Sequence, residues 1–272
     1  MEKISVCMVV YNEEKLIRRC LDSFFDVVDE IILVHDGECN DKTLEIAKEY
    51  GAKIFVLPHV GVAEEHRPFS FKQATNNWLF IIDADEFLSK ELHDNLKFLV
   101  SNKEGVVAYE LLWPLWDGEK EIDVSWPYKK MSLLNKRATS LLGMVHSEPQ
   151  VIGKVERINF KLKHQPEYNN FSRDSFIRKQ LPWARLQASY YLRDFSEIQK
   201  FNWSGSDWPK LIEYRRKFPL LLLPFEFVWT FFKIIFGGAY KAGSMGFKNA
   251  LTMSCYRASV NYYIYKLKYK HI

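Results

Sequence analysis

The chain has 272 residues, of which 47% are hydrophobic, 26% charged and 15% aromatic. This composition excludes a disordered chain, a collagen and a small disulfide-rich protein, and the length predicts one large α/β domain with an appendage. Four cysteines without CxxC spacing favour reduced thiols, and the first residues do not show the pattern of a signal peptide. We therefore expect a protein that is not exported.

The charge is divided unevenly along the chain, although the formal total is only +4. Residues 1–172 carry a net charge of −7, and residues 173–272 carry +11, with no acidic residue after Glu226. A rear part that is both basic and apolar favours a partner that presents phosphate, either lipid headgroups or nucleic acid. We predict an α/β domain over 1–172 and a helical, basic, amphipathic region over 173–272.

Strand and helix patterns alternate in the first hundred residues. Apolar runs typical of buried strands are separated by amphipathic segments, which predicts right-handed βαβ crossovers and a mainly parallel sheet. The predicted strands are 4–10, 30–34, 53–57 and 78–82, with helices over 16–25, capped by Asn12, and 41–50, capped by Asp41. Further strands are expected at 106–113, 130–135 and 158–164, and helices within 172–217.

Acidic side chains follow the predicted strands. Asp36 follows the second strand, and Asp83 and Asp85 follow the fourth. In an open parallel sheet, ligands bind outside the carboxyl ends of the strands. Two carboxylates one residue apart suit Mg²⁺ or Mn²⁺, which prefer oxygen ligands and bridge carboxylates to substrate phosphates. The alternative for this Asp-Ala-Asp-Glu segment is a solvated turn that caps a helix.

Four motifs in this order carry a resemblance to a known family. They are Val-Val-Tyr-Asn-Glu-Glu at 9–14, Glu-Ile-Ile-Leu-Val-His-Asp-Gly at 30–37, Asp-Lys-Thr at 41–43 and Asp-Ala-Asp-Glu at 83–86. The sequence resembles the inverting glycosyltransferase family 2, which has the GT-A fold. A later Val-His-Ser-Glu segment at 145–148 resembles the branch of that family that acts on the lipopolysaccharide core, with a serine inserted between His and Glu.

The resemblance implies a nucleotide-diphosphate sugar as donor, with a UDP-sugar favoured. It implies that Tyr11, Asn12 and Glu13 line the nucleotide pocket. It further implies that Asp36 accepts a hydrogen bond from the base and that Asp83 lies by the ribose.

The same resemblance implies a divalent metal, Mg²⁺ or Mn²⁺, at the leaving diphosphate. Asp85 is the expected ligand, with Asp83 and His164 as further candidates. His164 either ligates the metal through a neutral ring nitrogen or contacts the diphosphate, and a structural histidine is the alternative. Arg67 is the expected cationic contact to the diphosphate, and an exposed loop arginine is its alternative.

An inverting transfer also needs a general base that deprotonates the acceptor hydroxyl. The candidates are Glu148 and His146 in the Val-His-Ser-Glu segment and Asp117 in a tryptophan-rich loop. The residues alone do not decide among them, and each also suits a role in shaping the pocket.

Residues 218–238 form an apolar stretch that is long enough for a membrane-spanning helix, because about 20 such residues span a bilayer. Two prolines and the charged Glu226 and Lys233 argue against a simple span. These charges share a helix face, which favours an amphipathic helix lying in the interface, with a buried core helix as the alternative. The basic segment that follows suits an anionic membrane surface.

The complete hypothesis is a metal-dependent, inverting glycosyltransferase, peripheral on the cytoplasmic face of the inner membrane. Its acceptor is expected to be a lipid-linked or cell-envelope glycan, and no nucleic-acid partner is expected. One alternative is a phosphohydrolase of the haloacid dehalogenase type, although that fold carries its DxD on the first strand. The other alternative is a non-catalytic, membrane-bound protein that binds nucleotide sugars.

Overall fold

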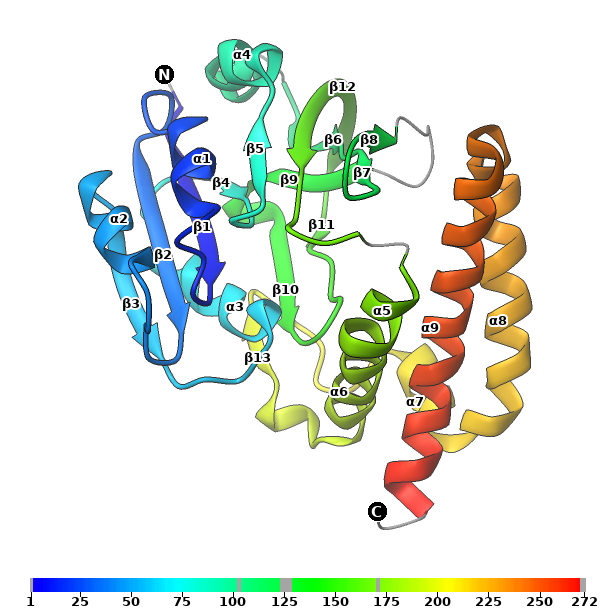
Figure 1. Ribbon diagram of the computed structural model, residues 1–272. Helices are drawn as coiled ribbons and strands as arrows, with labels where there is room; N and C mark the ends of the chain where they lie inside the picture. Colours follow the sequence, from blue (N-terminus) through cyan, green and yellow to red (C-terminus); the bar gives the residue numbers. More distant parts are fainter. Residues whose placement is uncertain (1, 102–103, 123–128, 170–171, 270–272) are drawn as a thin grey trace. The chain divides into compact units, whose positions relative to one another are not determined.

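The structure, a computed structural model, describes residues 2–101, 104–122, 129–169 and 172–269 (Figure 1). The chain forms two compact units. The sheet unit comprises residues 1–114, 129–165 and 199–203, and the helical unit comprises residues 115–128, 166–198 and 204–272.

The sheet unit is built on an eight-stranded mixed sheet that curls into a half-barrel, with strand order β3-β2-β1-β4-β9-β6-β12-β5. The strands are β1 (Ile4–Val10), β2 (Glu30–Asp36), β3 (Lys53–Leu57), β4 (Trp78–Ile81), β5 (Glu86–Leu88), β6 (Val106–Leu112), β9 (Lys129–Asn135) and β12 (Lys154–His164). Strands β3, β2, β1 and β4 are parallel, whereas β9 pairs antiparallel with β4 and β6. The predicted parallel sheet with a mixed extension is therefore confirmed.

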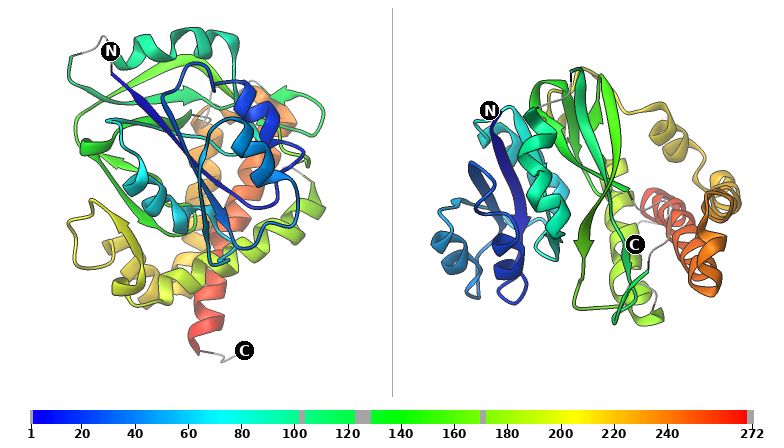
Figure 2. Two further views of the ribbon diagram at one scale, coloured as in Figure 1. Left: turned by 90° about the vertical axis from the view of Figure 1, so that its left-hand side faces the viewer. Right: turned by 90° about the horizontal axis from the view of Figure 1, so that it is seen from above.

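Both faces of the sheet are covered, which explains the continuous apolar run of β1. Alternate residues of β1, such as Val6, pack with α1 (Ile17–Asp22), α2 (Thr43–Glu49) and α4 (Lys90–Ser101). Cys7 points to the other face and packs with Phe71 of α3 (Ala63–Gln73). Figures 1 and 2 show α1 and α2 together on one side of the sheet.

A small second sheet of the sheet unit joins distant parts of the chain. It contains β10 (Thr139–Gly143), preceded by a 3-10 turn (Lys136–Ala138), together with β11 (Gln150–Val151) and β13 (Gln199–Phe201), in the order β11-β10-β13. The prediction of helix throughout 172–217 is wrong at β13, because these residues pair with β10 rather than only with local neighbours. Periodicity within a short segment carries no information about such long-range pairing.

One of the two predicted helix caps is absent from the structure. Asn12 does not cap α1, which begins at Ile17; it adopts a φ of 51° and accepts a hydrogen bond from the backbone of Asn40. Asp41 does accept a hydrogen bond from the backbone N–H of Thr43 at the start of α2, as expected. Asn12 therefore joins two loops instead of starting a helix.

The helical unit contains a short hairpin and a set of helices. They are β7 (Leu115–Trp116), β8 (Glu121–Ile122), α5 (Arg173–Ser175), a π-helical turn (Phe176–Gln180), α6 (Leu181–Leu192), a 3-10 turn (Phe195–Glu197), α7 (Lys210–Lys217), α8 (Pro219–Phe236), a 3-10 turn (Ala239–Ala242) and α9 (Gly243–Tyr269). Helices α8 and α9 run antiparallel and side by side (Figures 1 and 2). The predicted C-terminal helical extension is thus present.

A buried polar network joins the helices of this unit. Arg215 of α7 binds Glu226 of α8 with two hydrogen bonds of 2.6 and 3.0 Å, and it donates to the Tyr191 hydroxyl of α6 at 3.2 Å. Gln187 of α6 donates to the same hydroxyl and accepts from Tyr256 of α9, both at 2.8 Å. Glu226, the acidic residue within the apolar stretch, is therefore neutralised by α7.

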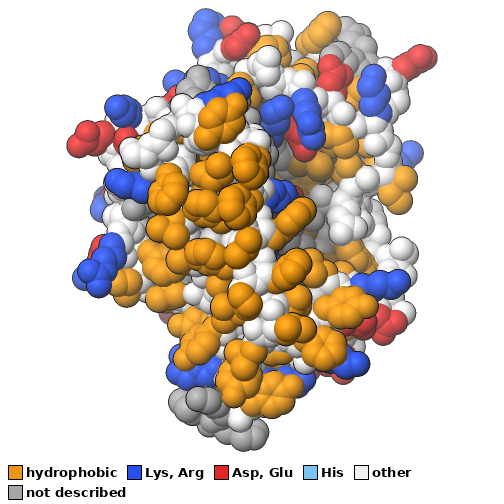
Figure 3. Space-filling model, turned by 90° about the vertical axis from the view of Figure 1, so that its right-hand side faces the viewer, with side chains coloured by type: hydrophobic (Ala, Val, Ile, Leu, Met, Phe, Trp, Pro, Cys, Tyr) orange, Lys and Arg blue, Asp and Glu red, His pale blue; other side chains and the backbone are white. Residues whose placement is uncertain are grey.

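Most of α8 is exposed rather than buried. Among the described residues, it is the one helix long and apolar enough to cross a bilayer, with 18 residues, a mean hydropathy of 1.7 and 11% of its residues buried. Its large exposed side chains include Leu221, Phe225, Trp229, Phe232 and Phe236, which recur at intervals of three to four residues. They form one continuous apolar face, visible in Figure 3, which we call the α8 face.

Candidate functional site

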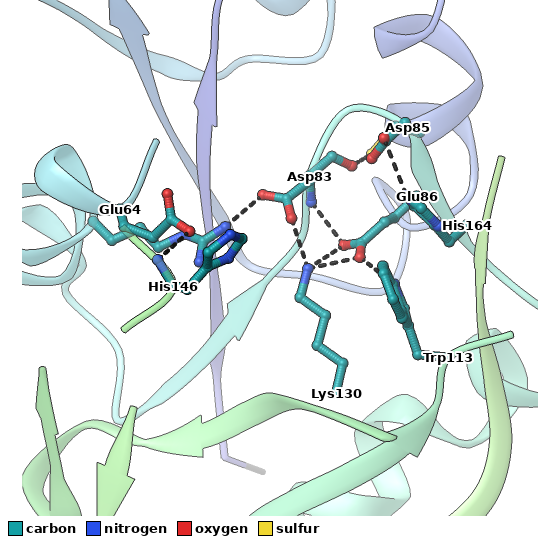
Figure 4. Close-up of polar contacts among 10 residues, drawn as sticks. Glu64, Asp83, Asp85, Glu86, Trp113, Lys130, His146 and His164 are labelled. Carbon is teal, nitrogen blue, oxygen red and sulfur yellow. Dashed lines mark hydrogen bonds and ion pairs between the residues drawn. The ribbon is translucent and has the colours of Figure 1, made fainter. Parts of the chain in front are cut away.

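The Asp-Ala-Asp segment lies directly after β4, in the turn that leads to β5. The carboxylate of Asp83 is held by two cations: its Oδ1 lies 2.8 Å from Arg67 Nη2 and its Oδ2 lies 2.7 Å from Lys130 Nζ. Arg67 comes from α3 and Lys130 from β9; Figure 4 shows Lys130 between Asp83 and Glu86. The structure thus brings the predicted residues Arg67 and Asp83 together and adds Lys130.

Lys130 also neutralises a second carboxylate. Its Nζ lies 2.6 and 2.7 Å from the two carboxylate oxygens of Glu86, which is fully buried. Glu86 further accepts hydrogen bonds from Trp113 Nε1 at 2.5 Å and from the backbone N–H of Asp83 at 2.9 Å. One ammonium group therefore joins Asp83 and Glu86, while the indole fixes the far side of Glu86.

The protonation equilibria follow from this arrangement. Burial alone would raise the pKa of Asp83, but Lys130 and Arg67 hold it well below its usual value. Burial by itself would lower the pKa of Lys130, and the carboxylates of Asp83 and Glu86 raise it instead. Glu86 has a raised pKa, first because it is buried and then because Asp83 and Asp85 are near, although Lys130 opposes the shift. Of the two carboxylates, Asp83 is therefore firmly ionised, whereas the negative charge of Glu86 depends on Lys130.

Asp85 and His164 form the other side of the site. Asp85 Oδ2 lies 3.3 Å from His164 Nε2, and the His164 ring stacks on Trp113 with ring centres 4.2 Å apart. The pairing of β12 with β5, which places His164 opposite Glu86, brings this histidine to the turn. His164 Nδ1 is buried and has no hydrogen-bond partner among the described residues.

Two potential metal ligands, Asp85 and His164, meet here, and they do not make a complete metal-binding site by themselves. Within the described part of the chain, no three His, Cys, Asp or Glu side chains are placed to hold one ion. Asp85 and His164 supply one carboxylate oxygen and one imidazole nitrogen, whereas both oxygens of Asp83 are occupied by cations. A carboxylate and an imidazole suit Mn²⁺ or Mg²⁺ when substrate phosphates supply the remaining ligands.

Hydrogen bonds join the loops after β1 and β2 at Asn12 and Glu13, which are predicted to line the nucleotide pocket. The backbone N–H of Glu13 donates to Thr43 Oγ1 at 2.6 Å, and Asn12 Oδ1 accepts from the backbone of Asn40 at 2.9 Å. The backbone N–H of Asn12 also donates to His35 Nε2 at 3.2 Å. An acceptor role for Nε2 requires that the His35 proton reside on Nδ1, which lies 2.9 Å from the carbonyl of Gly37.

Asp36 is buried and bonded on all sides. Its Oδ1 accepts from the backbone of Val60 at 2.7 Å and lies 3.0 Å from His66 Nε2; its Oδ2 accepts from the backbone of Gly61 at 2.9 Å and lies 3.2 Å from His59 Nδ1. A carboxylate offers about four acceptor sites. The predicted hydrogen bond from a nucleobase would therefore require that one of these donors give way.

Tyr11 lies at the edge of this cluster with its ring half exposed. Its ring centre is 4.7 Å from that of His59 and 5.9 Å from that of His35. Gly37 permits this packing, because it has a φ of 99° and a Cβ there would lie 2.8 Å from the Cβ of His59. Tyr11 and His59 together offer a flat aromatic surface next to the ends of β1 and β2.

The candidates for the general base lie in different places. His146 follows β10 with a φ of 56°, and its backbone N–H donates to Glu64 Oε1 at 3.2 Å. Figure 4 places Glu64 and His146 on one side of Asp83, opposite Asp85 and His164. Glu148, two residues further, is exposed. Asp117 belongs to the helical unit, where two backbone N–H groups of its own turn, from Lys120 and then Glu119, lower its pKa.

Two residues of this site, Lys130 and Glu86, are not assigned a role by the sequence. Lys130 lies within a predicted strand, and Glu86 only completes the Asp-Ala-Asp-Glu motif. Trp113 belongs to the tryptophan-rich loop, for which an acceptor platform and core packing are the alternatives; in the structure it binds Glu86 and stacks on His164. The available signal was a charged residue at the start of an apolar strand, because a buried strand carries a lysine only where a carboxylate meets it. The partner itself was not visible in the sequence, since Lys130 and Glu86 are far apart in the chain.

Known proteins resemble this chain over most of its length. Residues 5–152 match the family described as Glycosyl transferase family 2. An uncharacterized glycosyltransferase of Rickettsia typhi is 29% identical over 250 residues, covering 87% of this chain and 77% of that protein. A homologous uncharacterized glycosyltransferase of Rickettsia felis is also 29% identical, covering 87% of this chain and 80% of its own.

Among solved structures, glucosyl-3-phosphoglycerate synthase from Mycobacterium tuberculosis is a partial match. Its complex with Mn²⁺, UDP and phosphoglyceric acid is 22% identical, covers 41% of this chain and 43% of its own, and gives a TM-score of 0.36.

The buried ion pair makes a prediction about stability. Replacement of Lys130 by Met leaves the Glu86 carboxylate buried without its cation, so we expect a loss of roughly 3 kcal/mol in the free energy of unfolding at neutral pH. The loss should shrink as the pH is lowered from 7 to 5. The folded-state pKa of Glu86 lies above its unfolded value, and protonation then removes the buried charge.

Urea unfolding of the wild type and the variant at several pH values measures this difference. Lys129→Met, at the exposed neighbouring position, is the matched control and should change stability little. Glu86→Gln combined with Lys130→Met should recover part of the loss. A loss in Lys130→Met that does not depend on pH would contradict the electrostatic explanation.

Proposed function

This chain belongs to glycosyl transferase family 2, and from that membership we propose that it transfers a sugar from a nucleotide-diphosphate sugar, preferably a UDP-sugar, to a membrane-associated or cell-envelope glycan. The sheet unit has the GT-A fold expected for such an enzyme. Glycosyltransferase activity itself follows from the family. The donor, the acceptor, the metal and inversion at the anomeric carbon are the parts that we propose.

The observation that carries the proposal is the charge arrangement after β4. Arg67, Lys130 and His164 surround the carboxylates of Asp83 and Asp85 in the sheet unit. Departure of a nucleoside diphosphate concentrates negative charge on the leaving phosphate, and prearranged cations stabilise that charge. Asp83 keeps Arg67 and Lys130 in place, and its one-third exposed carboxylate is available to the ribose hydroxyls.

The side chains of Asp85 and His164 suit a divalent metal ion. Asp85 and His164 would hold Mg²⁺ or Mn²⁺, with diphosphate oxygens as further ligands, and the bound ion would neutralise charge on the leaving group. Trp113 stacks on the His164 ring and thereby fixes its orientation. Asp83 is the less suitable ligand, because Arg67 and Lys130 already bind its two oxygens.

Inversion requires one displacement step. The acceptor oxygen forms its bond to the anomeric carbon on the face opposite the diphosphate, the bond from carbon to the diphosphate oxygen breaks, and a base takes the hydroxyl proton. We assign that base to the segment that holds His146 and Glu148. Asp117 is less suited, because hydrogen bonds to its own turn lower its pKa and weaken it as a base.

The alternative functions are less favoured. A phosphohydrolase of the haloacid dehalogenase type carries its aspartate pair after the first strand, whereas this pair follows β4. A non-catalytic binding protein is less favoured because the chain keeps both Asp83 and Asp85. Both alternatives also differ from the family to which the chain belongs.

The helical unit supports a membrane-associated acceptor. The α8 face exposes large apolar side chains, and the acidic Glu226 is neutralised by Arg215 inside the unit. An amphipathic helix with these properties lies in the interface of a bilayer. We therefore propose a peripheral enzyme on the cytoplasmic face of the inner membrane, with residues 173–272 serving attachment and 1–172 serving catalysis.

The metal role of Asp85 can be tested directly. Asp85→Asn should lower donor turnover by at least about 100-fold, because it removes charge stabilisation of the leaving group. It should also abolish the Mn²⁺-dependent part of the thermal shift produced by the preferred donor in a panel of UDP-, GDP-, CDP- and dTDP-sugars. Glu91→Gln on α4 is the matched control, and normal turnover in Asp85→Asn would refute the metal site.

The base is identified by two further variants. His146→Gln and Glu148→Gln should differ, with one lowering kcat by about 100-fold or more while leaving the KM for the donor unchanged. That variant should also lose the acidic limb of the pH profile of kcat. Ser147→Ala controls for disturbance of the loop, and nearly normal kcat in both variants would exclude this segment as the source of the base.

Membrane attachment depends on the α8 face in this proposal. Replacing Leu221, Phe225 and Trp229 by Ser should weaken binding to phospholipid vesicles by at least about 100-fold, because it removes their apolar surface from the interface. Val56→Ser, Phe98→Ser and Ile152→Ser together remove comparable exposed residues from the sheet unit and serve as the control. Equal flotation of both triple variants with vesicles would rule out this attachment.

A further inference from the structure

Three cations converge where α7 and α9 end in the helical unit. Arg216, Lys217 and Lys268, together with Glu213, line an open depression of about 240 Å³ on the surface of the unit. Lys268 Nζ donates to the backbone carbonyl of Arg216 at 2.9 Å, which ties the two helix ends together. Among the described residues, none of these three cations forms an ion pair with a carboxylate. The lining therefore carries a net positive charge, because the one carboxylate of Glu213 faces three cations.

This cluster borders the α8 face. Lys217 directly precedes Phe218, and its Nζ lies 5.3 Å from the centre of that exposed ring. Leu221 and Phe225 follow on the same helix with about 70% of their surface exposed. In an amphipathic helix at a bilayer surface, the apolar residues enter the acyl boundary and the flanking cations meet the headgroups.

The charge pattern around the face favours a bilayer over a second copy of the chain. Lys233, Lys241 and Lys248 lie toward the other end of the α8–α9 hairpin, so both ends are basic. Pairing of two such faces, whether parallel or antiparallel, would bring like charges together. An anionic bilayer instead matches the apolar centre and both basic ends at once.

The dipoles of the two helices explain only part of the cluster. A cation at a helix C-terminus is stabilised by the free carbonyl groups, and Lys268 is bonded in this way to the end of α7. The Arg216 guanidinium lies 5.9 Å from the Trp208 ring, and Lys217 is exposed. These two side chains keep hydrogen-bond donors available for an oxyanion.

We propose that Arg216, Lys217 and Lys268 form a binding site for the phosphate group of an anionic phospholipid at the edge of the α8 face. The site rests on the proposed membrane attachment and gives it selectivity for lipid charge. The planar guanidinium offers paired donors to two phosphate oxygens, and the two ammonium groups add charge. Attachment then has two separable parts, insertion of the apolar face and recognition of the headgroup.

The experiment compares vesicle binding of the full chain and of Arg216→Gln, Lys217→Gln and Lys268→Gln combined. Vesicles of phosphatidylcholine alone and of phosphatidylcholine mixed with phosphatidylglycerol are used at low salt. The triple variant should lose roughly 100-fold in affinity for the mixed vesicles, equivalent to about 3 kcal/mol. Its weaker binding to phosphatidylcholine should be unchanged.

Lys48→Gln, Lys72→Gln and Lys154→Gln make a matched control, because they remove the same charge from exposed positions of the sheet unit. An equal loss in this control would overturn the site in favour of general electrostatic attraction. An unchanged affinity of the Arg216, Lys217 and Lys268 variant for mixed vesicles, with only a lower melting temperature, would overturn it in favour of a role at the helix ends.

Inorganic phosphate distinguishes the lipid from a soluble anion. A variant that loses thermal stabilisation by inorganic phosphate, yet binds mixed vesicles normally, would overturn the lipid assignment. Failure of the proposed attachment has a different result, since the wild type would then bind neither kind of vesicle. Failure of the proposed enzyme function would appear as the absence of donor turnover in the wild type, which is measured separately from vesicle binding.

Discussion

Neutralisation of the carboxylates after β4 is the constraint on which the sheet unit depends. Asp83 and Glu86 are close in the chain; Glu86 is fully buried and Asp83 is partly buried, and both carboxylates need a cation to remain charged there. Lys130 supplies that cation to both, and Arg67 supplies a second one to Asp83. The network therefore connects β4, β5, β9 and α3, the same elements that arrange the candidate site.

This constraint separates the two aspartates. Because Arg67 and Lys130 bind Asp83, its carboxylate serves to position cations, while Asp85 remains beside His164 with oxygen available for a metal. A motif of two aspartates thus contains two different functions. The residue type is the same, so the burial and the neighbouring charges of each aspartate determine its function.

The helical unit also contains an acidic residue that a neighbouring cation neutralises. Arg215 and Glu226 satisfy each other inside the unit, with Tyr191 as a further partner. The charged residue that interrupts the apolar stretch is thereby turned away from the exposed side of α8. The exposed apolar side of α8 agrees with the amphipathic helix that the sequence favours, and it contradicts the alternative of a buried core helix.

The sequence by itself determined the alternation of strands and helices, the parallel sheet and the aspartates at the end of the fourth strand. These features are local, because apolar periodicity and strand ends depend on neighbouring residues. Only the tertiary structure decided that β13 returns to β10, that Asn12 links loops instead of capping α1, and that Lys130 meets Asp83 and Glu86. Such contacts depend on which distant segments pack together, and a pattern read along the chain does not contain that information.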